Sequence, residues 1–167
     1  SVLMMSDQLR VANLLPLTQP YTLSPFNYQG TESVLSSRLS VTGASSIVDW
    51  VLVELRSASA PATVIAQKAA LLTRSGDVID SATNGMVLTF PNLVSTSYYV
   101  VLKHRNHLGV MTATALNLAV ANNVSVDFDQ PTTLIYGNNL HGMLSVGSRR
   151  VLWAGDANHD QSVIANG

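Results

Sequence analysis

Ile47-Val48-Asp49-Trp50-Val51-Leu52-Val53-Glu54-Leu55-Arg56 is the stretch of sequence that decides the fold. Successive side chains of a strand point to opposite faces, so Trp50 and Leu52 point one way and Val51 and Val53 the other. Tryptophan and three valines within ten residues favour a strand over a helix. Both faces are largely apolar, which predicts a strand that is covered by protein on both sides.

Short β-rich runs separated by turn signals surround this strand. Further β-rich runs lie at residues 32–41, 63–72, 78–80, 86–90, 97–104, 110–118, 124–128 and 132–136, and we expect seven to eight strands among all of these runs. The alanines of residues 63–72 also fit a helix, but the hairpin signal Arg74-Ser75-Gly76-Asp77 favours a strand. Asn84-Gly85 is a second turn signal. Seven to eight short strands at a spacing of about 8–12 residues predict an all-β sandwich.

The N-terminal residues 1–30 differ from this pattern. Ser6-Asp7-Gln8 followed by periodic apolar residues predicts a short capped helix, which Pro16 and Pro20 end. The stretch up to Gly30 is expected to be extended. We therefore divide the chain into an N-terminal helical or extended segment (1–30) that docks on a neighbour, a β-sandwich domain (31–150) and a partial calcium loop (151–167).

Composition excludes several classes of protein. The 167 residues are 47% apolar, which predicts a packed fold and not a disordered chain. Charged residues make up only 11%, against about 25% in an average soluble domain. The arginines are scattered apart from Arg149-Arg150, which gives no footprint for nucleic acid. No apolar run approaches the roughly 18 residues of a membrane span. The absence of cysteine excludes disulfides and cysteine catalysis.

The C-terminal sequence 155–163 has the spacing of a calcium-binding loop. Asp156, Asn158 and Asp160 fall at loop positions 1, 3 and 5, and the carbonyl of Ser162 falls at position 7. Calcium prefers six to eight oxygen ligands, and alternating oxygen side chains on a curling backbone converge on one point. The sequence therefore predicts Ca²⁺ at these residues. The alternative is a polar tail in which Asx side chains cap turns.

Two positions depart from the calcium-loop pattern. Gln161 stands where the loop usually has glycine, and Gly167 stands at position 12, where a bidentate carboxylate is usual. The bidentate ligand is therefore expected either to be missing or to come from sequence beyond this chain or from a partner.

Other constellations are weaker. His104 and His107 invite a zinc interpretation, but no third ligand is near in sequence, so placement at a strand-end turn is preferred. Asp127 and Asp129 alternate on one expected strand face and are interpreted as solvated strand-end carboxylates. No nucleophile–base pair, phosphate loop or metal set has a recognisable spacing, so the chain is predicted not to be an enzyme. Asn123 opens an acceptor-type sequon, whose glycosylation is left open.

Several segments resemble a module of large secreted and surface proteins of Bacteroidetes-type bacteria. They span nearly the whole chain in order: residues 14–21, 48–56, 69–78, 97–101, 104–112 and 152–160. The resemblance implies an Ig-like (Greek-key) or transthyretin-like β-sandwich followed by a dockerin-like calcium segment. It implies a secreted or cell-surface location and no enzymatic activity. The family's calcium ligands carry over to Asp156, Asn158, Asp160 and the Ser162 carbonyl.

Low charge and this resemblance predict a structural or adhesive module that self-assembles, as a filament or multidomain array, with calcium at the junction. Its partners are expected to be copies of itself or neighbouring modules. The apolar N-terminal residues Val2, Leu3, Met4 and Met5 are predicted to add as a strand to a neighbour's sheet edge. One alternative is a glycan-binding module that uses Tyr28 and Tyr136 as stacking platforms. A second alternative is an accessory domain of a secreted hydrolase.

Overall fold

Strands dominate the fold, and the all-β class is confirmed. The computed structural model describes residues 4–94, 97–119, 123–137 and 142–156. Within these ranges the helical elements are α1 (Gln8–Val11) and the 3₁₀ helix η1 (Ser36–Ser40). The strands are β1 (Ile47–Ser57), β2 (Val64–Thr73), β3 (Val78–Ile79), β4 (Ser97–His104), β5 (His107–Met111), β6 (Leu116–Asn117), β7 (Leu144–Val146) and β8 (Arg149–Val151). Over the same ranges, no helix is long and apolar enough to cross a membrane.

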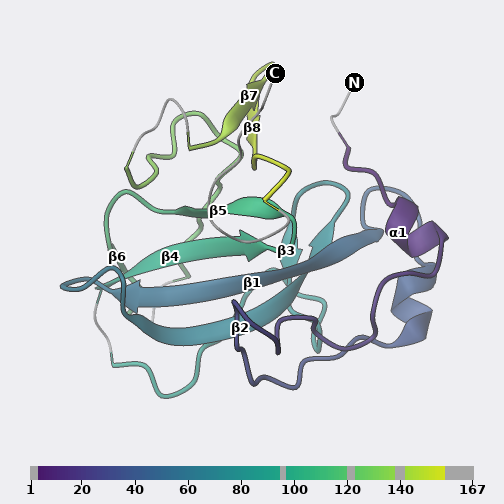
Figure 1. Cartoon of the computed structure of the whole chain (residues 1–167), viewed down its shortest axis with the longest axis horizontal. Helices are drawn as coiled ribbons and strands as arrows, with labels where there is room; N and C mark the ends of the chain where they lie inside the picture. Colours follow the sequence, from purple (N-terminus) through teal and green to yellow (C-terminus); the bar gives the residue numbers. More distant parts are fainter. Residues whose placement is uncertain (1–3, 95–96, 120–122, 138–141, 157–167) are drawn as a thin grey trace. The chain divides into compact units, whose positions relative to one another are not determined.

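The strands form one large antiparallel sheet and one small hairpin (Figure 1). The large sheet has the order β3-β2-β1-β4-β5, and β6 also pairs with β4. β5 pairs with the second half of β4, from Val101 onward, and β6 pairs with Ser97 and Tyr98 at its start. β5 and β6 therefore follow one another along the same strand. β7 and β8 make the separate two-stranded sheet.

The chain divides into two compact units, and each has its own apolar cluster. The first unit comprises Ser1–Leu52 and Lys68–Thr89, and the second comprises Val53–Gln67 and Phe90–Gly167. The cluster of the first unit consists of Leu15, Tyr21, Val34, Ile47, Trp50, Leu52, Ala69, Leu71 and Ile79. The cluster of the second unit is built on Val110, Ile135 and Met143.

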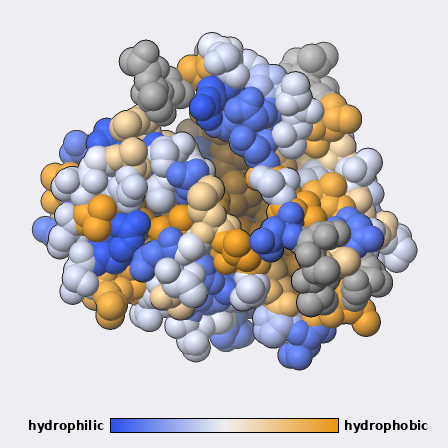
Figure 2. All heavy atoms as spheres, turned by 180° about the vertical axis from the view of Figure 1, so that it is seen from behind, coloured by the Kyte–Doolittle hydropathy of each residue, from blue (hydrophilic) through white to orange (hydrophobic). Residues whose placement is uncertain are grey.

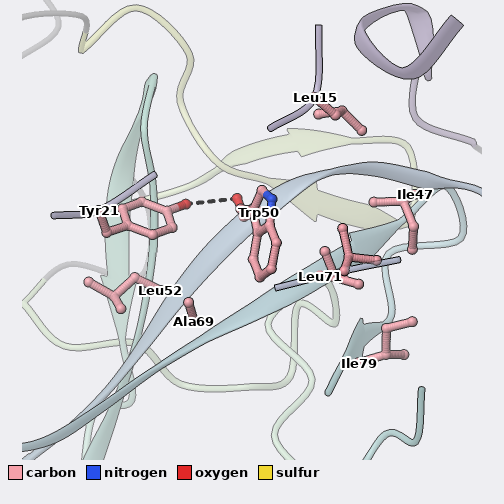
Figure 3. Packing of buried hydrophobic residues seen from close by; sticks show 9 residues of the cluster. Leu15, Tyr21, Ile47, Trp50, Leu52, Ala69, Leu71 and Ile79 are labelled. Carbon is pink, nitrogen blue, oxygen red and sulfur yellow. Dashed lines mark hydrogen bonds between the residues drawn. The ribbon is translucent and has the colours of Figure 1, made fainter. Parts of the chain in front are cut away.

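Trp50 of β1 fastens the N-terminal segment to the sheet of the first unit. Its side chain is 1% exposed, and its indole Nε1 donates a hydrogen bond of 2.9 Å to the carbonyl of Pro16. Its own carbonyl accepts a bond of 2.7 Å from the hydroxyl of Tyr21, which the dashed line in Figure 3 marks. The predicted burial of β1 is confirmed, because every residue from Ile47 to Leu55 is buried.

The predicted N-terminal helix exists but is short. α1 covers four residues, and Asp7 at its N-cap makes no side-chain cap. The Asp7 carboxylate instead accepts from Arg10 at 2.6 Å and from the Ser46 hydroxyl at 3.3 Å. This carboxylate therefore ties the segment to the turn before β1.

Two predicted strands are wrong in the first unit. Residues 32–41 form a single bridge at Ser33 and then the 3₁₀ helix, because Val34 is buried and Leu39 packs against the core from the helix, while Leu35 stays 77% exposed. Residues 86–90 form no strand either. Met86 and Val87 are exposed, so their apolar run does not mark burial against a sheet.

Predictions for the second unit need similar correction. The expected strand 110–118 is two strands, β5 and β6, and β5 begins three residues earlier, at His107. Residues 124–128 and 132–136 contain no strand, although Ile135 makes a single bridge to Thr112. The β7–β8 hairpin was not predicted.

Candidate functional site

The start of the predicted calcium loop is docked on the turn between β4 and β5. Leu108 N donates to the Trp153 carbonyl at 2.9 Å, and Gly155 N donates to the Asn106 carbonyl at 3.0 Å. Between these two bonds, Ala154 bridges His107 in antiparallel pairing. The structure thus joins two clusters that the sequence places about fifty residues apart, and it fixes the backbone immediately before Asp156.

Asp156 is a buried carboxylate with an unsatisfied oxygen. The residue is 4% exposed, and its Oδ1 has no hydrogen-bond partner among the residues that the structure describes. An unpaired polar oxygen away from water costs free energy, and a carboxylate oxygen costs more than a neutral one. A hard cation would compensate this cost, so the residue fits the first position of a calcium loop. Asn158, Asp160 and Ser162 lie outside the described residues, and their role remains a prediction.

The two histidines of the β4–β5 turn are bonded to each other. His104 ends β4, His107 begins β5, and their Nδ1 atoms are 2.8 Å apart with the rings edge to face. The backbone N–H of Asn106 also points at His104 Nδ1, at 3.2 Å. His104 Nδ1 is therefore the acceptor and His107 Nδ1 carries the shared proton. Across the described ranges, no three His, Asp or Glu side chains are placed to hold one metal ion.

A buried ion-pair network around Glu54 was not anticipated from the sequence. Glu54 is 1% exposed, and its two oxygens accept from Gln67 and Lys103, both at 3.0 Å, and from Arg56 at 2.7 Å. Burial acts to raise the pKa of Glu54, but the charges of Lys103 and Arg56 outweigh it and hold the pKa below its ordinary value of 4.5. Every oxygen is satisfied, so this network supports the sheet and offers no free base.

A hollow of about 600 Å³ lies in the first unit, lined among others by Glu32, Arg38, Lys68, Asp80 and Asn84. Most of its charged side chains are bonded to a neighbour, but the buried Oε2 of Glu32 has no hydrogen-bond partner within the described residues. Lys68 Nζ is 2.6 Å from Asp80 Oδ2, and Arg38 Nε donates to Asn84 Oδ1 at 3.0 Å. The two basic side chains of the hollow, Arg38 and Lys68, are thus bonded within the chain.

The two tyrosines predicted as glycan platforms have different surroundings. Tyr28 packs against the core cluster, and its hydroxyl donates to Glu32. Burial, reinforced by the Glu32 carboxylate, raises the pKa of Tyr28. Tyr136 is 51% exposed and makes an edge-to-face contact with Tyr99 at 5.8 Å between ring centroids. Tyr136 is therefore the more exposed ring of this pair, and Tyr28 is partly buried.

The apolar N-terminal residues are described in part. Met4 and Met5 are 43% and 40% exposed, while Val2 and Leu3 lie outside the described residues. The Met5 backbone pairs with the chain's own β2–β3 turn. Its N–H donates to the Arg74 carbonyl and its carbonyl accepts from Arg74 Nε, both at 2.9 Å.

Asp127 and Asp129 do not lie on a strand, contrary to the prediction. They sit in a turn, where Asp129 N donates to Asp127 Oδ1 at 3.2 Å and the Asp129 carboxylate pairs with Arg149. Burial, together with the neighbouring Asp129 carboxylate, raises the pKa of Asp127. The pair joins the turn to the β7–β8 hairpin.

Comparison of the chain with protein-family models, with curated proteins and with solved structures found no match.

Asp156→Asn tests whether the buried carboxylate serves a cation. In chelator, we expect the variant to be as stable as the wild type or more stable, because the substitution removes an unpaired buried charge. In calcium at 100 times the dissociation constant, the wild type gains about 2.7 kcal/mol that the variant lacks. Urea denaturation under both conditions measures the difference. A stability difference that is the same in calcium and in chelator contradicts a cation role, and Asp77→Asn is the control.

Proposed function

We propose that this chain is a non-catalytic structural or adhesive module of a bacterial extracellular or surface protein, and that it associates with copies of itself or with neighbouring modules. One combined observation carries the proposal: most basic side chains form ion pairs within the chain, while large apolar side chains are exposed. At least six of the nine basic side chains form ion pairs within the chain: Arg10, Arg56, Lys68, Arg74, Lys103 and Arg149.

This internal pairing leaves little repulsion between copies. The net charge is only −1, and a charge near zero favours association. Large apolar side chains meanwhile remain exposed on both units, among them Leu14 at 67%, Met86 at 68% and Val94 at 72%. Figure 2 shows hydrophobic residues spread between hydrophilic ones over one face. Such a surface suits contact with other protein.

Three finer parts of the proposal have different support. An Ig-like sandwich is supported by the antiparallel pairing of the strands and by the resemblance of the segments named above. Calcium at the junction is supported by the buried, unsatisfied oxygen of Asp156. A secreted or cell-surface location is supported by the resemblance of the segments named above to modules of such proteins.

Glycan binding is the second candidate, and the exposed ring of Tyr136 is the observation in its favour. Glycan-array binding that Tyr136→Ala abolishes, and that Leu134→Ala at a 60% exposed apolar neighbour retains, would favour it over self-association.

Light scattering over a range of concentrations tests the proposed association. The weight-average mass is expected to rise with concentration in calcium and to fall when a chelator is added. A chelator-indifferent monomer at high concentration contradicts the proposal.

A further inference from the structure

The large sheet has two edges, and they differ in how they are covered. β5 is covered at both ends. Trp153–Gly155 bond to Asn106–Leu108, and Ala113 N and the Met111 carbonyl bond to Leu134 and Tyr136. At the opposite edge, β3 pairs with β2 only at Leu71 and Leu72. Within the described ranges, no other strand or bridge pairs with this side of β2.

The exposed part of this second edge is the segment Val64–Gln67, which lies within the second unit. Val64 and Ile65 are 40% and 48% exposed. Natural sheets protect such edges with charged side chains, proline, bulges or very short strands. Val64-Ile65-Ala66-Gln67 has neither charge nor proline and continues into a strand of ten residues. An unprotected edge of this kind is a template for pairing with another strand.

We infer that Val64–Gln67 pairs antiparallel with the same segment of a second copy, with the two-fold axis at Ala66. This inference rests on the proposed self-association and assigns its contact surface. A strand that pairs with the same strand of a second copy across a two-fold axis forms an isologous interface. Each residue then lies opposite the residue at the same distance on the other side of the axis, and the two must be compatible. Here Ala66 lies opposite Ala66 of the second copy, Ile65 lies opposite Gln67, and main-chain hydrogen bonds join the strands.

The charge pattern favours a second copy as the occupant. The segment is uncharged, and the one charge that adjoins it, Lys68, is neutralised within its own chain by Asp80 at 2.6 Å. Two such edges therefore meet without like-charge repulsion, which would oppose pairing of directly opposite residues. The N-terminal segment of a neighbour is a weaker candidate, because Met5 is already bonded to Arg74 of its own chain.

The absence of cysteine allows a direct test, because each cysteine introduced is the only one. Opposite residues of antiparallel strands have Cα atoms about 4.5–5.5 Å apart, within the range of a disulfide. Ala66→Cys is therefore expected to cross-link to a dimer under mild oxidation at least ten times faster than Ala58→Cys, at an exposed alanine in a turn. Equal rates overturn the inference. Preferential cross-linking of Ala66→Cys to Met4→Cys also overturns it and assigns the edge to the N-terminal segment.

A charge at the edge gives an independent readout. Ile65→Lys should raise the concentration needed for association at least ten-fold, whereas Val87→Lys, at a comparably exposed apolar site in a loop, should not. Sedimentation velocity measures both, and circular dichroism verifies the fold. If the wild type associates and both variants behave alike, the edge assignment fails while the proposed function stands. If the wild type is a monomer in calcium at every concentration, both fail.

Discussion

Trp50→Ala is expected to lower the free energy of unfolding by about 4 kcal/mol. The substitution empties a site that is 1% exposed, and it also leaves the Pro16 carbonyl without its donor. A loss of this size is a large part of the 5–15 kcal/mol of an ordinary domain, so the variant is expected to fold poorly.

Trp50→Phe keeps the experiment informative. It retains most of the apolar volume but loses the indole bond to Pro16, and a loss of about 1–2 kcal/mol is expected. Urea denaturation of both variants, read by circular dichroism, measures these differences. Equal losses for alanine and phenylalanine would contradict the packing role of the ring, and a loss below about 1 kcal/mol for alanine would contradict the burial of the site.

Glu54→Ala is expected to cost about 3 kcal/mol at neutral pH. The substitution removes the acceptor of Lys103, Arg56 and Gln67 together. Lys103 and Arg56 are partly exposed, with side chains 30% and 22% accessible, so water compensates some of their loss. A double-mutant cycle with Lys103→Ala isolates the coupling between the two charges. Additive effects would contradict the network.

The same network gives a pH dependence whose sign follows from the pKa of Glu54. Because the pKa of the folded state is held below the ordinary 4.5, the network stabilises the fold above pH 4.5. That contribution is lost as the pH falls below 4.5, through the folded-state pKa. Wild type should therefore lose more stability than Glu54→Ala over this acid range, when both are measured by denaturation at successive pH values. Parallel losses would contradict this assignment.

Sequence patterns predict the central strands of the sheet correctly, but their predictions for the outer segments are wrong. β1 and β4 are rich in β-branched and aromatic residues; β1 is buried from Ile47 to Leu55 and β4 buries Tyr98 and Val101, so local pattern and tertiary environment agree there. Residues 86–90 are equally apolar, but they pair with no strand and Val87 remains 53% exposed. Hydrophobicity alone does not tell a buried strand from an apolar loop.

The β7–β8 hairpin, which was not predicted, does have a local sequence signal. Gly147-Ser148 separates two short alternating runs, and Gly147 adopts φ of +61°, which glycine adopts at little cost. Asp156 was identified from spacing alone, but its contact partner, the Asn106–Leu108 backbone, was not. Pairing between segments about fifty residues apart leaves no local pattern in a single sequence. Glu54 was missed as a site for the same reason, since two of its partners are on other strands.

Sedimentation velocity of the unmodified chain, in calcium and then in chelator, tests the central claim that the chain associates with copies of itself through its surface. We predict that the sedimentation coefficient rises with concentration in calcium, and that chelator or Asp156→Asn reduces the rise. A single monomeric species under every condition would contradict the account.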